Sequence, residues 1–231
     1  TGSEPVPISG FRVTDDGRYY LIAGPSGQPK LPYTQAPRER SHYIYTPSTR
    51  DFRPLSGIVE TQKYPKFSPD GGKVGFVCGG NLFVADLDTG SERQLTLDGA
   101  RDIMNGENKG FGEDGWLWSP DSRRIVFVQV DQSMIRSIPL VDYMPYYPKV
   151  HMIKYPKSGE QNWKLRIGAI HLETGKTTWL DFDKDTDVYY PRLKWTRDPD
   201  KVAVEQLNRE QNRLELLYAD VVSGDVRVVL T

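Results

Sequence analysis

Residues 115–128 read "GWLWSPDSRRIVFV", and residues 64–77 read "YPKFSPDGGKVGFV". Both segments place an aromatic residue before Ser-Pro-Asp, and then a small turn residue, a basic residue and an apolar run. Residues 13–17 and 195–199 align with them, each again before a basic residue and an apolar run. An aspartate at such a turn accepts hydrogen bonds from backbone N–H groups, and the aromatic residue packs between sheets. A segment that recurs in this way predicts stacked supersecondary units.

Short apolar runs alternate with turn signals along the whole chain. Runs such as "KVGFV", "NLFVADL", "RIVFVQV" and "KVAVEQL" are rich in β-branched or aromatic residues, and several alternate with a period of two. The turn pairs between the runs are Asp70-Gly71, Thr89-Gly90, Thr174-Gly175 and Ser223-Gly224. Because 17 prolines and 21 glycines leave few windows for a long helix, we predict an all-β chain.

Each repeat continues through a second strand and a tight hairpin to a closing strand, which describes a four-stranded antiparallel blade. The first repeat departs at the hairpin, where "PSTRDFRPL" replaces the Thr-Gly turn. Radial repetition of such blades is a β-propeller, and we predict a partial one over residues 1–231. The expected blades cover residues 8–60, 61–99, 100–182 and 183–231. A β-sandwich with coincidental Ser-Pro-Asp turns is the alternative.

The third repeat is longer than the others because of an insertion at residues 131–163. Its sequence "MPYYPKVHMIKYPKSGEQNW" is rich in aromatic residues, prolines and lysines. One interpretation is a long surface loop or a strand pair that covers one end of the ring. The other is a lid or contact surface, because long insertions in compact domains are often functional.

Composition excludes several classes of protein. The 231 residues carry 30 basic and 31 acidic side chains, and a net charge of -1 gives no field that favours nucleic acid or an anionic membrane. No apolar run approaches the roughly 18–20 residues of a membrane span. Cys78 is the single cysteine, which excludes disulfide and cysteine-rich metal scaffolds.

The motifs of catalytic chemistry are missing from the sequence. No Gly-x-Ser-x-Gly elbow occurs, and none of His42, His151 and His171 accompanies a nucleophile motif. We expect His171 to be a strand surface residue and leave ligand contact open for the other two histidines. The acidic run at 181–187 lacks the glycine and terminal glutamate of a calcium loop. We therefore expect no metal and no cofactor, and the chain alone does not carry a complete active site.

Four segments in this order carry a resemblance to a known family. They are "FSPDGGKVGFVCGGNLFVADLDTGSERQLT", "WLWSPDSRRIVFVQVDQS", "IKYPKSGEQNWKLRIGAIHLETGKTTWL" and "LNREQNRLELLYAD". From about residue 8 to residue 231 the chain resembles the propeller of the dipeptidyl peptidase IV family, which are serine exopeptidases of the prolyl oligopeptidase clan. "YPKSG…N" combined with "LNREQNRLELL" is the most specific part. The resemblance implies an eight-bladed ring, of which this chain is about half, and an α/β-hydrolase domain that is absent from the chain.

The resemblance also implies where a substrate would bind. In the family, acidic residues, often an adjacent Glu pair, hold the free α-amino group of the peptide, and an Arg contacts a substrate carbonyl. The corresponding interval here is "NGENKGFGEDGWLWSP", which contains Glu107 and Glu113 but no Glu-Glu dipeptide. The segment "APRERSHYIY" offers Arg38 and Arg40, of which Arg40 is preferred by position. For each of the four residues the alternative is a solvated surface charge.

The function that these observations predict is the substrate-gating, N-terminus-binding segment of a dipeptidyl or tripeptidyl peptidase. The whole enzyme would cleave short peptides from free N-termini, after Pro or Ala, through a Ser-His-Asp triad. Its partners would be the peptide N-terminus, the missing propeller half, the hydrolase domain and a second copy of the chain. The resemblance implies a periplasmic or secreted protein. The alternatives are a non-catalytic TolB-like or WD-repeat-like scaffold and an inactive relative of the peptidases.

Overall fold

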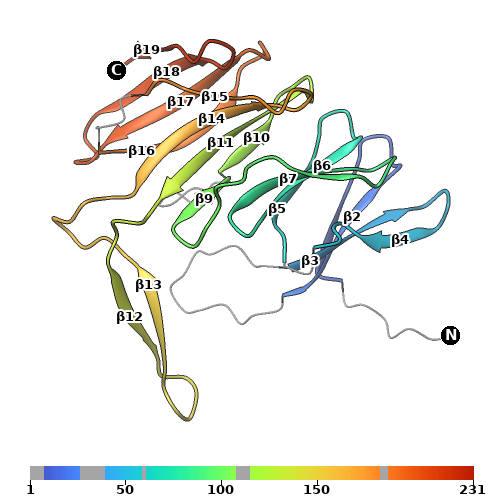
Figure 1. Cartoon of the computed structure of the whole chain (residues 1–231), viewed down its shortest axis with the longest axis horizontal. Helices are drawn as coiled ribbons and strands as arrows, with labels where there is room; N and C mark the ends of the chain where they lie inside the picture. The colour runs from blue at the N-terminus through green and yellow to red at the C-terminus, as the bar shows by residue number, and fades with distance from the viewer. Residues whose placement is uncertain (1–7, 27–39, 59–60, 108–114, 183–186) are drawn as a thin grey trace. The chain divides into compact units, whose positions relative to one another are not determined.

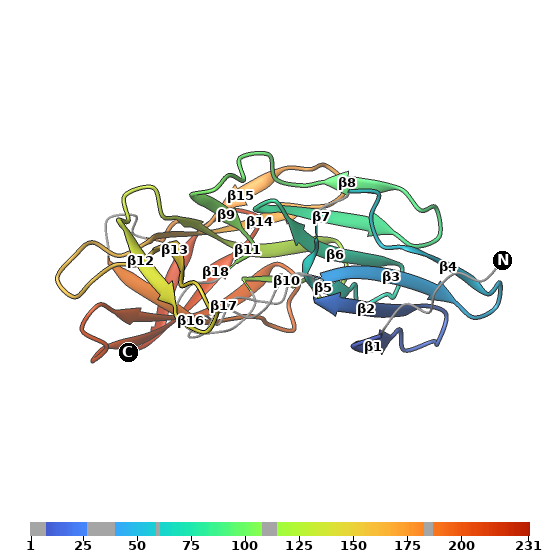
Figure 2. The same cartoon turned by 90° about the horizontal axis from the view of Figure 1, so that it is seen from below.

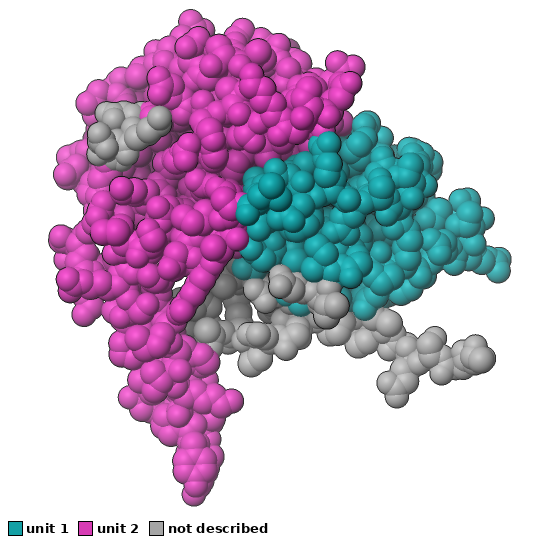
Figure 3. All heavy atoms as spheres, viewed as in Figure 1, with its two compact units in different colours: residues 1–97 teal, residues 98–231 magenta. Residues whose placement is uncertain are grey.

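The fold is seen in a computed structural model of the chain, which describes residues 8–26, 40–58, 61–107, 115–182 and 187–231 (Figure 1). These residues form strands β1 to β19 and contain no helix, which confirms the prediction of an all-β chain. Accordingly, no described segment is a long apolar helix of the kind that crosses a membrane. The chain divides into two compact units, residues 1–97 and residues 98–231 (Figure 3).

The first unit contains two antiparallel four-stranded sheets, with the orders β1-β2-β3-β4 and β5-β6-β7-β8 (Figure 2). The strands are β1 (Gly10–Val13), β2 (Tyr20–Ser26), β3 (Arg40–Thr46), β4 (Asp51–Pro54), β5 (Lys63–Phe67), β6 (Lys73–Cys78), β7 (Asn81–Asp86) and β8 (Glu92–Gln94). Each strand pairs with the next one in the chain, so each sheet is a simple meander. This is the topology of a propeller blade.

The second unit contains a four-stranded sheet, a five-stranded sheet and a two-stranded sheet. The strands are β9 (Ile103–Asn105), β10 (Trp116–Trp118), β11 (Arg124–Asp131), β12 (Ser137–Asp142), β13 (Lys149–Lys154), β14 (Lys164–His171), β15 (Thr177–Trp179), β16 (Val188–Trp195), β17 (Lys201–Asn208), β18 (Leu214–Asp220) and β19 (Val226–Leu230). Strands β16 to β19 repeat the meander. In the five-stranded sheet the order is β10-β11-β14-β15, and β9 also pairs with β11.

The insertion at 131–163 contains the strand pair β12–β13, which was one of the interpretations left open. In Figure 1 this hairpin extends away from the sheet that contains β11 and β14. Its turn and strands expose large apolar side chains: Tyr143, Met144, Tyr146, Tyr147, Val150 and Met152. The hairpin therefore adds apolar surface outside the sheets, and nothing in the described structure covers that surface.

The recurring turn has one hydrogen-bond pattern in all four sheets. The N–H groups of Thr14, Ser68, Ser119 and Thr196 donate to the carbonyl groups of Tyr19, Lys73, Arg124 and Lys201, at 3.0, 2.9, 2.9 and 3.0 Å. In three of the turns the hydroxyl also donates to the aspartate two residues later, as Ser119 Oγ does to Asp121 Oδ1 at 2.6 Å. The preceding aromatic residues Phe67, Trp118 and Trp195 each end the first strand of their sheet. The alignment that the sequence predicts is therefore a structural equivalence.

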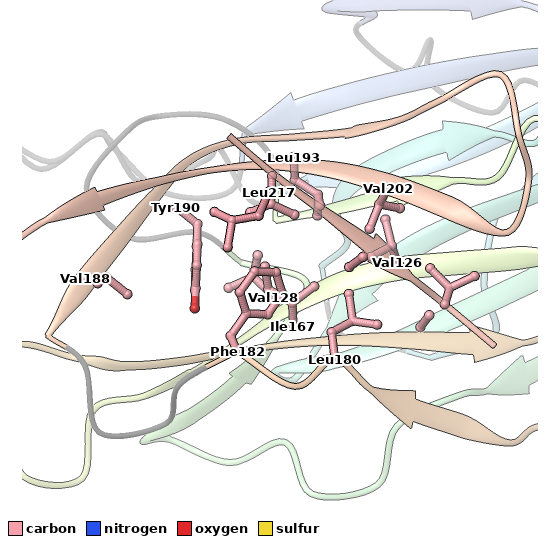
Figure 4. Packing of buried hydrophobic residues seen from close by; sticks show 14 of the residues in the cluster. Val126, Val128, Ile167, Leu180, Phe182, Val188, Tyr190, Leu193, Val202 and Leu217 are labelled. Carbon is pink, nitrogen blue, oxygen red and sulfur yellow. The ribbon is translucent and has the colours of Figure 1, made fainter. Parts of the chain in front are cut away.

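Each unit has a core between its own sheets. In the first unit, Ile44 of β3 and Phe76 of β6 are fully buried in one cluster, and the rings of Phe76 and Phe83 stack at 5.5 Å. Figure 4 shows the core of the second unit, where Val126 of β11 and Ile167 of β14 face residues of β16 to β18. Inward-facing residues of adjacent blades thus form the apolar contacts that the alternating strands predict.

The turn aspartates give the fold a dependence on pH. The Arg18 backbone N–H, its guanidinium and the Thr14 hydroxyl all donate to Asp16 and lower its pKa from 3.8 to about 2. The pKa of Asp198 is lowered by Lys201, and the pKa of Asp220 by the N–H groups of Ser223 and Val222. Because a carboxyl with a depressed folded-state pKa stabilises above its unfolded pKa, that contribution is lost as pH falls toward the folded pKa.

We therefore expect the free energy of unfolding to decrease as pH falls from 3.8 to about 2. Urea denaturation at a series of pH values measures this, and a carboxyl NMR titration should place the midpoint of Asp16 near 2. Asp16→Asn keeps the acceptor oxygen but does not titrate, so it should weaken the pH dependence. A variant with the same pH dependence as the wild type would contradict the assignment to this turn.

Candidate functional site

The acidic interval of the second unit interrupts the first strand of its sheet. Strand β10 pairs with Ile125 to Phe127 of β11, and β9 pairs with Gln129 to Asp131, so Val128 lies between them. The N–H of Gly106 donates to the Val128 carbonyl at 2.9 Å, and the Val128 N–H donates to the Gly115 carbonyl at 2.7 Å. Both ends of segment 107–114 are thus bonded to the same residue, which is 1% exposed. The segment is anchored in the core of the unit.

Glu107 is the first residue of this segment, and only 6% of it is exposed. It follows Gly106, whose φ of 79° lies in the left-handed region that glycine adopts without strain. A carboxylate held at such a depth interacts with a cation in a lower effective dielectric than it would on the surface. Glu107 is therefore placed to act as a strong partner for a positively charged group.

Three polar side chains meet beside the base of the segment. The Asn105 Nδ2 group donates to Asp98 Oδ1 at 2.9 Å, and the Gln129 Nε2 group donates to Asp98 Oδ2 at 2.8 Å. Gln129 Nε2 also donates to Asn105 Oδ1 at 3.0 Å. Asn105 is fully buried and Gln129 is 6% exposed. The sequence reasoning missed this cluster, although a glutamine inside the apolar run "RIVFVQV" is a signal that could have pointed to it.

Of the other predicted site residues, only Arg40 is among the described residues. It is the first residue of β3 in the first unit, and its guanidinium donates to Ser9 Oγ. Its carbonyl accepts a hydrogen bond from the Gln62 N–H at 3.0 Å. Arg38 and Glu113 lie outside the described residues. Since Arg40 and Glu107 belong to different units, the structure does not bring them into one site.

The three histidines differ in their surroundings. His42 in β3 is 7% exposed, its N–H donates to Gln62 Oε1 at 3.0 Å, and burial lowers the pKa of its imidazole. His151 lies in β13 and His171 at the end of β14, and both are half-buried. His171 Nδ1 accepts a hydrogen bond from the Thr174 N–H at 3.5 Å. Among the described residues, no nucleophile stands beside any of the three in these contacts.

The two segments that carry the most specific part of the resemblance contact each other in the second unit. Arg209, from "LNREQNRLELL", donates to the carbonyl of Glu160, from "YPKSGEQN", at 3.0 Å. The same guanidinium forms an ion pair with Asp187 at 3.1 Å. A pocket of about 210 Å³ lies next to this contact and is lined by Met134, Ile135, Arg136, Glu160 and Gln161. The arginine therefore links the end of the insertion to the sheet β16–β19.

Comparison with known proteins agrees with this geometry. The family model described as "Dipeptidyl peptidase IV (DPP IV) N-terminal region" matches residues 29–231. A protein of Neosartorya fischeri named "Probable dipeptidyl peptidase 4" is 29% identical over 202 residues, which are 79% of this chain and 26% of that protein. "Probable dipeptidyl-aminopeptidase B" of Talaromyces marneffei is 29% identical over 210 residues, which are 79% and 23% of the two chains.

A solved structure gives the same result for the fold. The crystal structure of Porphyromonas gingivalis dipeptidyl peptidase 4 matches with a TM-score of 0.86 and 29% sequence identity. The match covers 96% of this chain and 32% of that one. The chain thus spans about a quarter of the length of the curated relatives and about a third of the solved structure.

Proposed function

The chain belongs to the dipeptidyl peptidase IV family, whose N-terminal region it matches, and on this premise we propose that it binds the free N-terminus of a peptide substrate. The whole protein is then a serine-type peptidase that removes dipeptides or tripeptides, after Pro or Ala, and this region gates access to its active site. Its partners are the peptide, the rest of the propeller and an α/β-hydrolase domain, and a second copy of the chain is included in the proposal.

The observation that carries the proposal is the placement of Glu107. An α-ammonium group that enters a partly closed cavity loses water, and a buried carboxylate compensates that loss through a charge-assisted hydrogen bond. Glu107 is 6% exposed and stands at the anchored base of segment 107–114. We assign it the ammonium, with Glu113 as a second carboxylate and Arg40 or Arg38 as the group that contacts a substrate carbonyl.

A blocked substrate tests the proposal directly. In the whole protein that contains this chain, Ala-Pro-p-nitroanilide should be cleaved with a kcat/KM about 100-fold or more above that of its N-acetyl derivative. The acetyl group removes the charge that the carboxylate binds, and truncating one side of a buried charge pair costs about 2–5 kcal/mol. Steady-state kinetics on both substrates measures the ratio.

The isolated 231-residue chain is the control for this experiment. It should cleave neither substrate, because no Gly-x-Ser-x-Gly motif occurs in it. Equal turnover of the free and the acetylated substrate by the whole protein would rule out recognition of the N-terminus. Turnover by the isolated chain that responds to substitutions within it would show that the nucleophile lies here.

A further inference from the structure

The strand that leads to Glu107 is short for the task of holding a binding residue in place. Strand β9 has only three residues, Ile103–Asn105, which pair with Asp131, Val130 and Gln129 of β11. It ends at Gly106, and glycine occupies more backbone conformations than any other residue. The ladder of β9 alone would therefore leave the direction of Glu107 poorly fixed.

The cluster of Asp98, Asn105 and Gln129 supplies the missing constraint. Each carboxylate oxygen of Asp98 accepts one amide N–H, from Asn105 at 2.9 Å and from Gln129 at 2.8 Å. The Gln129 amide also donates to the Asn105 carbonyl oxygen at 3.0 Å, which closes the cluster. Hydrogen bonds to an ionised acceptor are shorter and stronger than neutral ones. The end of β9 is thus joined to β11 by side chains as well as by backbone.

The cluster is also the last fixed point before the binding residue. Asn105 and Glu107 are separated only by Gly106, whose N–H is bonded to Val128, the neighbour of Gln129. A fully satisfied buried polar network specifies one arrangement, whereas apolar side chains at these positions would tolerate several. The cost of burying the amides is compensated only while all three members stay in register.

From this geometry we infer that Asp98, Asn105 and Gln129 form a positioning network that sets where Glu107 presents its carboxylate. This inference rests on the proposed function, because it assigns the network a role in binding the substrate ammonium through Glu107. None of the three residues touches the substrate. Their effect on the reaction is indirect and passes through the two bonds of Gly106 that precede Glu107.

Gln129→Glu tests the network with almost no change of volume. The substitution removes both amide donations and places a second carboxylate against Asp98, and like charges at hydrogen-bond distance repel. In the whole protein we expect kcat/KM for Ala-Pro-p-nitroanilide to fall about tenfold or more through a rise in KM, with kcat nearly unchanged. The double variant Asp98→Asn with Gln129→Glu restores a donor opposite the new carboxylate and should recover part of the loss.

Gln206→Glu is the matched control. Gln206 lies in β17 of the same unit, and its amide donates to Glu215 at 3.5 Å, so the chemical change is the same at a site remote in sequence from Glu107. KM should stay within about twofold of the wild type. A rise in KM as large as that of Gln129→Glu would show that the loss reports general stability, and it would overturn the inference.

A double-mutant cycle separates this inference from the proposed function. If the network acts through Glu107, Gln129→Glu should add little to the KM of Glu107→Gln, because contacts in one unit are not additive. Additive effects would overturn the positioning role and leave the role of Glu107 intact. An unchanged KM in Glu107→Gln would instead contradict the proposed function.

Hydrogen exchange on the 231-residue chain gives a readout that does not depend on activity. Gln129→Glu should accelerate exchange of the amides of residues 103–107 and leave those of β17 and β18 near their wild-type rates. Unchanged exchange in 103–107 would overturn the inference whatever the kinetics show. Restored protection in the double variant with Asp98→Asn would support it, and no restoration would count against the direct contact between positions 98 and 129.

Discussion

Replacing Phe76 with alanine is expected to lower the free energy of unfolding of the first unit by about 3–5 kcal/mol. Phe76 is fully buried in the cluster between the two sheets of that unit, and its ring stacks on Phe83 at 5.5 Å with an interplanar angle of 11°. Deletion of the ring removes this contact and leaves a cavity that a stiff pair of sheets closes only in part. The effect should appear in the denaturation midpoint.

The sequence itself supplies separate probes for the two units. All five tryptophans lie beyond residue 98, whereas the single cysteine, Cys78, is buried in the first unit in the same cluster as Phe76. Thiol labelling of Cys78 at moderate urea therefore reports opening of the first unit, and tryptophan fluorescence reports the second. Phe76→Ala should accelerate labelling on the order of 10²- to 10³-fold, since 1.4 kcal/mol corresponds to a factor of ten.

Phe11→Ala is the matched control for this variant. Phe11 lies in β1 of the same unit and is 65% exposed, so its removal creates no cavity and should change the free energy of unfolding by no more than about 0.5 kcal/mol. Phe76→Leu should be intermediate, because it restores part of the lost volume. A loss of less than about 1 kcal/mol in Phe76→Ala would mean that the described cluster is not the core of the unit.

The repeat could be predicted from sequence because its interactions are local. A hydroxyl, an aspartate and a basic residue within six positions determine the turn, as in Ser119 to Arg124. The alternating runs then predict strands on either side. Strand β9 could not be predicted in the same way, since a three-residue strand is too short for any period to appear. It exists only because β11 offers it an edge.

The candidate site was predicted less completely for the same reason. The acidic residue at 107 could be selected from the resemblance, but its burial depends on the pairing of Asn105 with Gln129, residues that are 24 positions apart. The network that contains Asp98 depends on the same long-range pairing. Sequence periodicity shows which residues share a strand face, and it does not show which strand edge a short segment will join.

The substitution with the largest expected effect on function is Glu107→Gln. In the whole protein we expect kcat/KM for Ala-Pro-p-nitroanilide to fall about 100-fold or more, since a buried charge pair that loses one partner costs about 2–5 kcal/mol. Glutamine has nearly the same volume and a 6% exposed site accepts it without a cavity, so the loss should reflect the missing charge. Most of it should appear in KM if the ammonium is bound equally in the ground and transition states.

The preference for a free N-terminus is the most specific measure of this variant. If Glu107 binds the ammonium, the ratio of kcat/KM between Ala-Pro-p-nitroanilide and its acetylated form should collapse in Glu107→Gln, because the acetylated substrate never used the carboxylate. Glu173→Gln is the matched control: it removes the same charge from an exposed turn between β14 and β15, and it should leave the ratio unchanged. Thermal unfolding of Glu107→Gln should match the wild type or exceed it, since a neutral amide is less costly to bury than a carboxylate. A preserved ratio in a folded Glu107→Gln protein would show that another group recognises the substrate N-terminus.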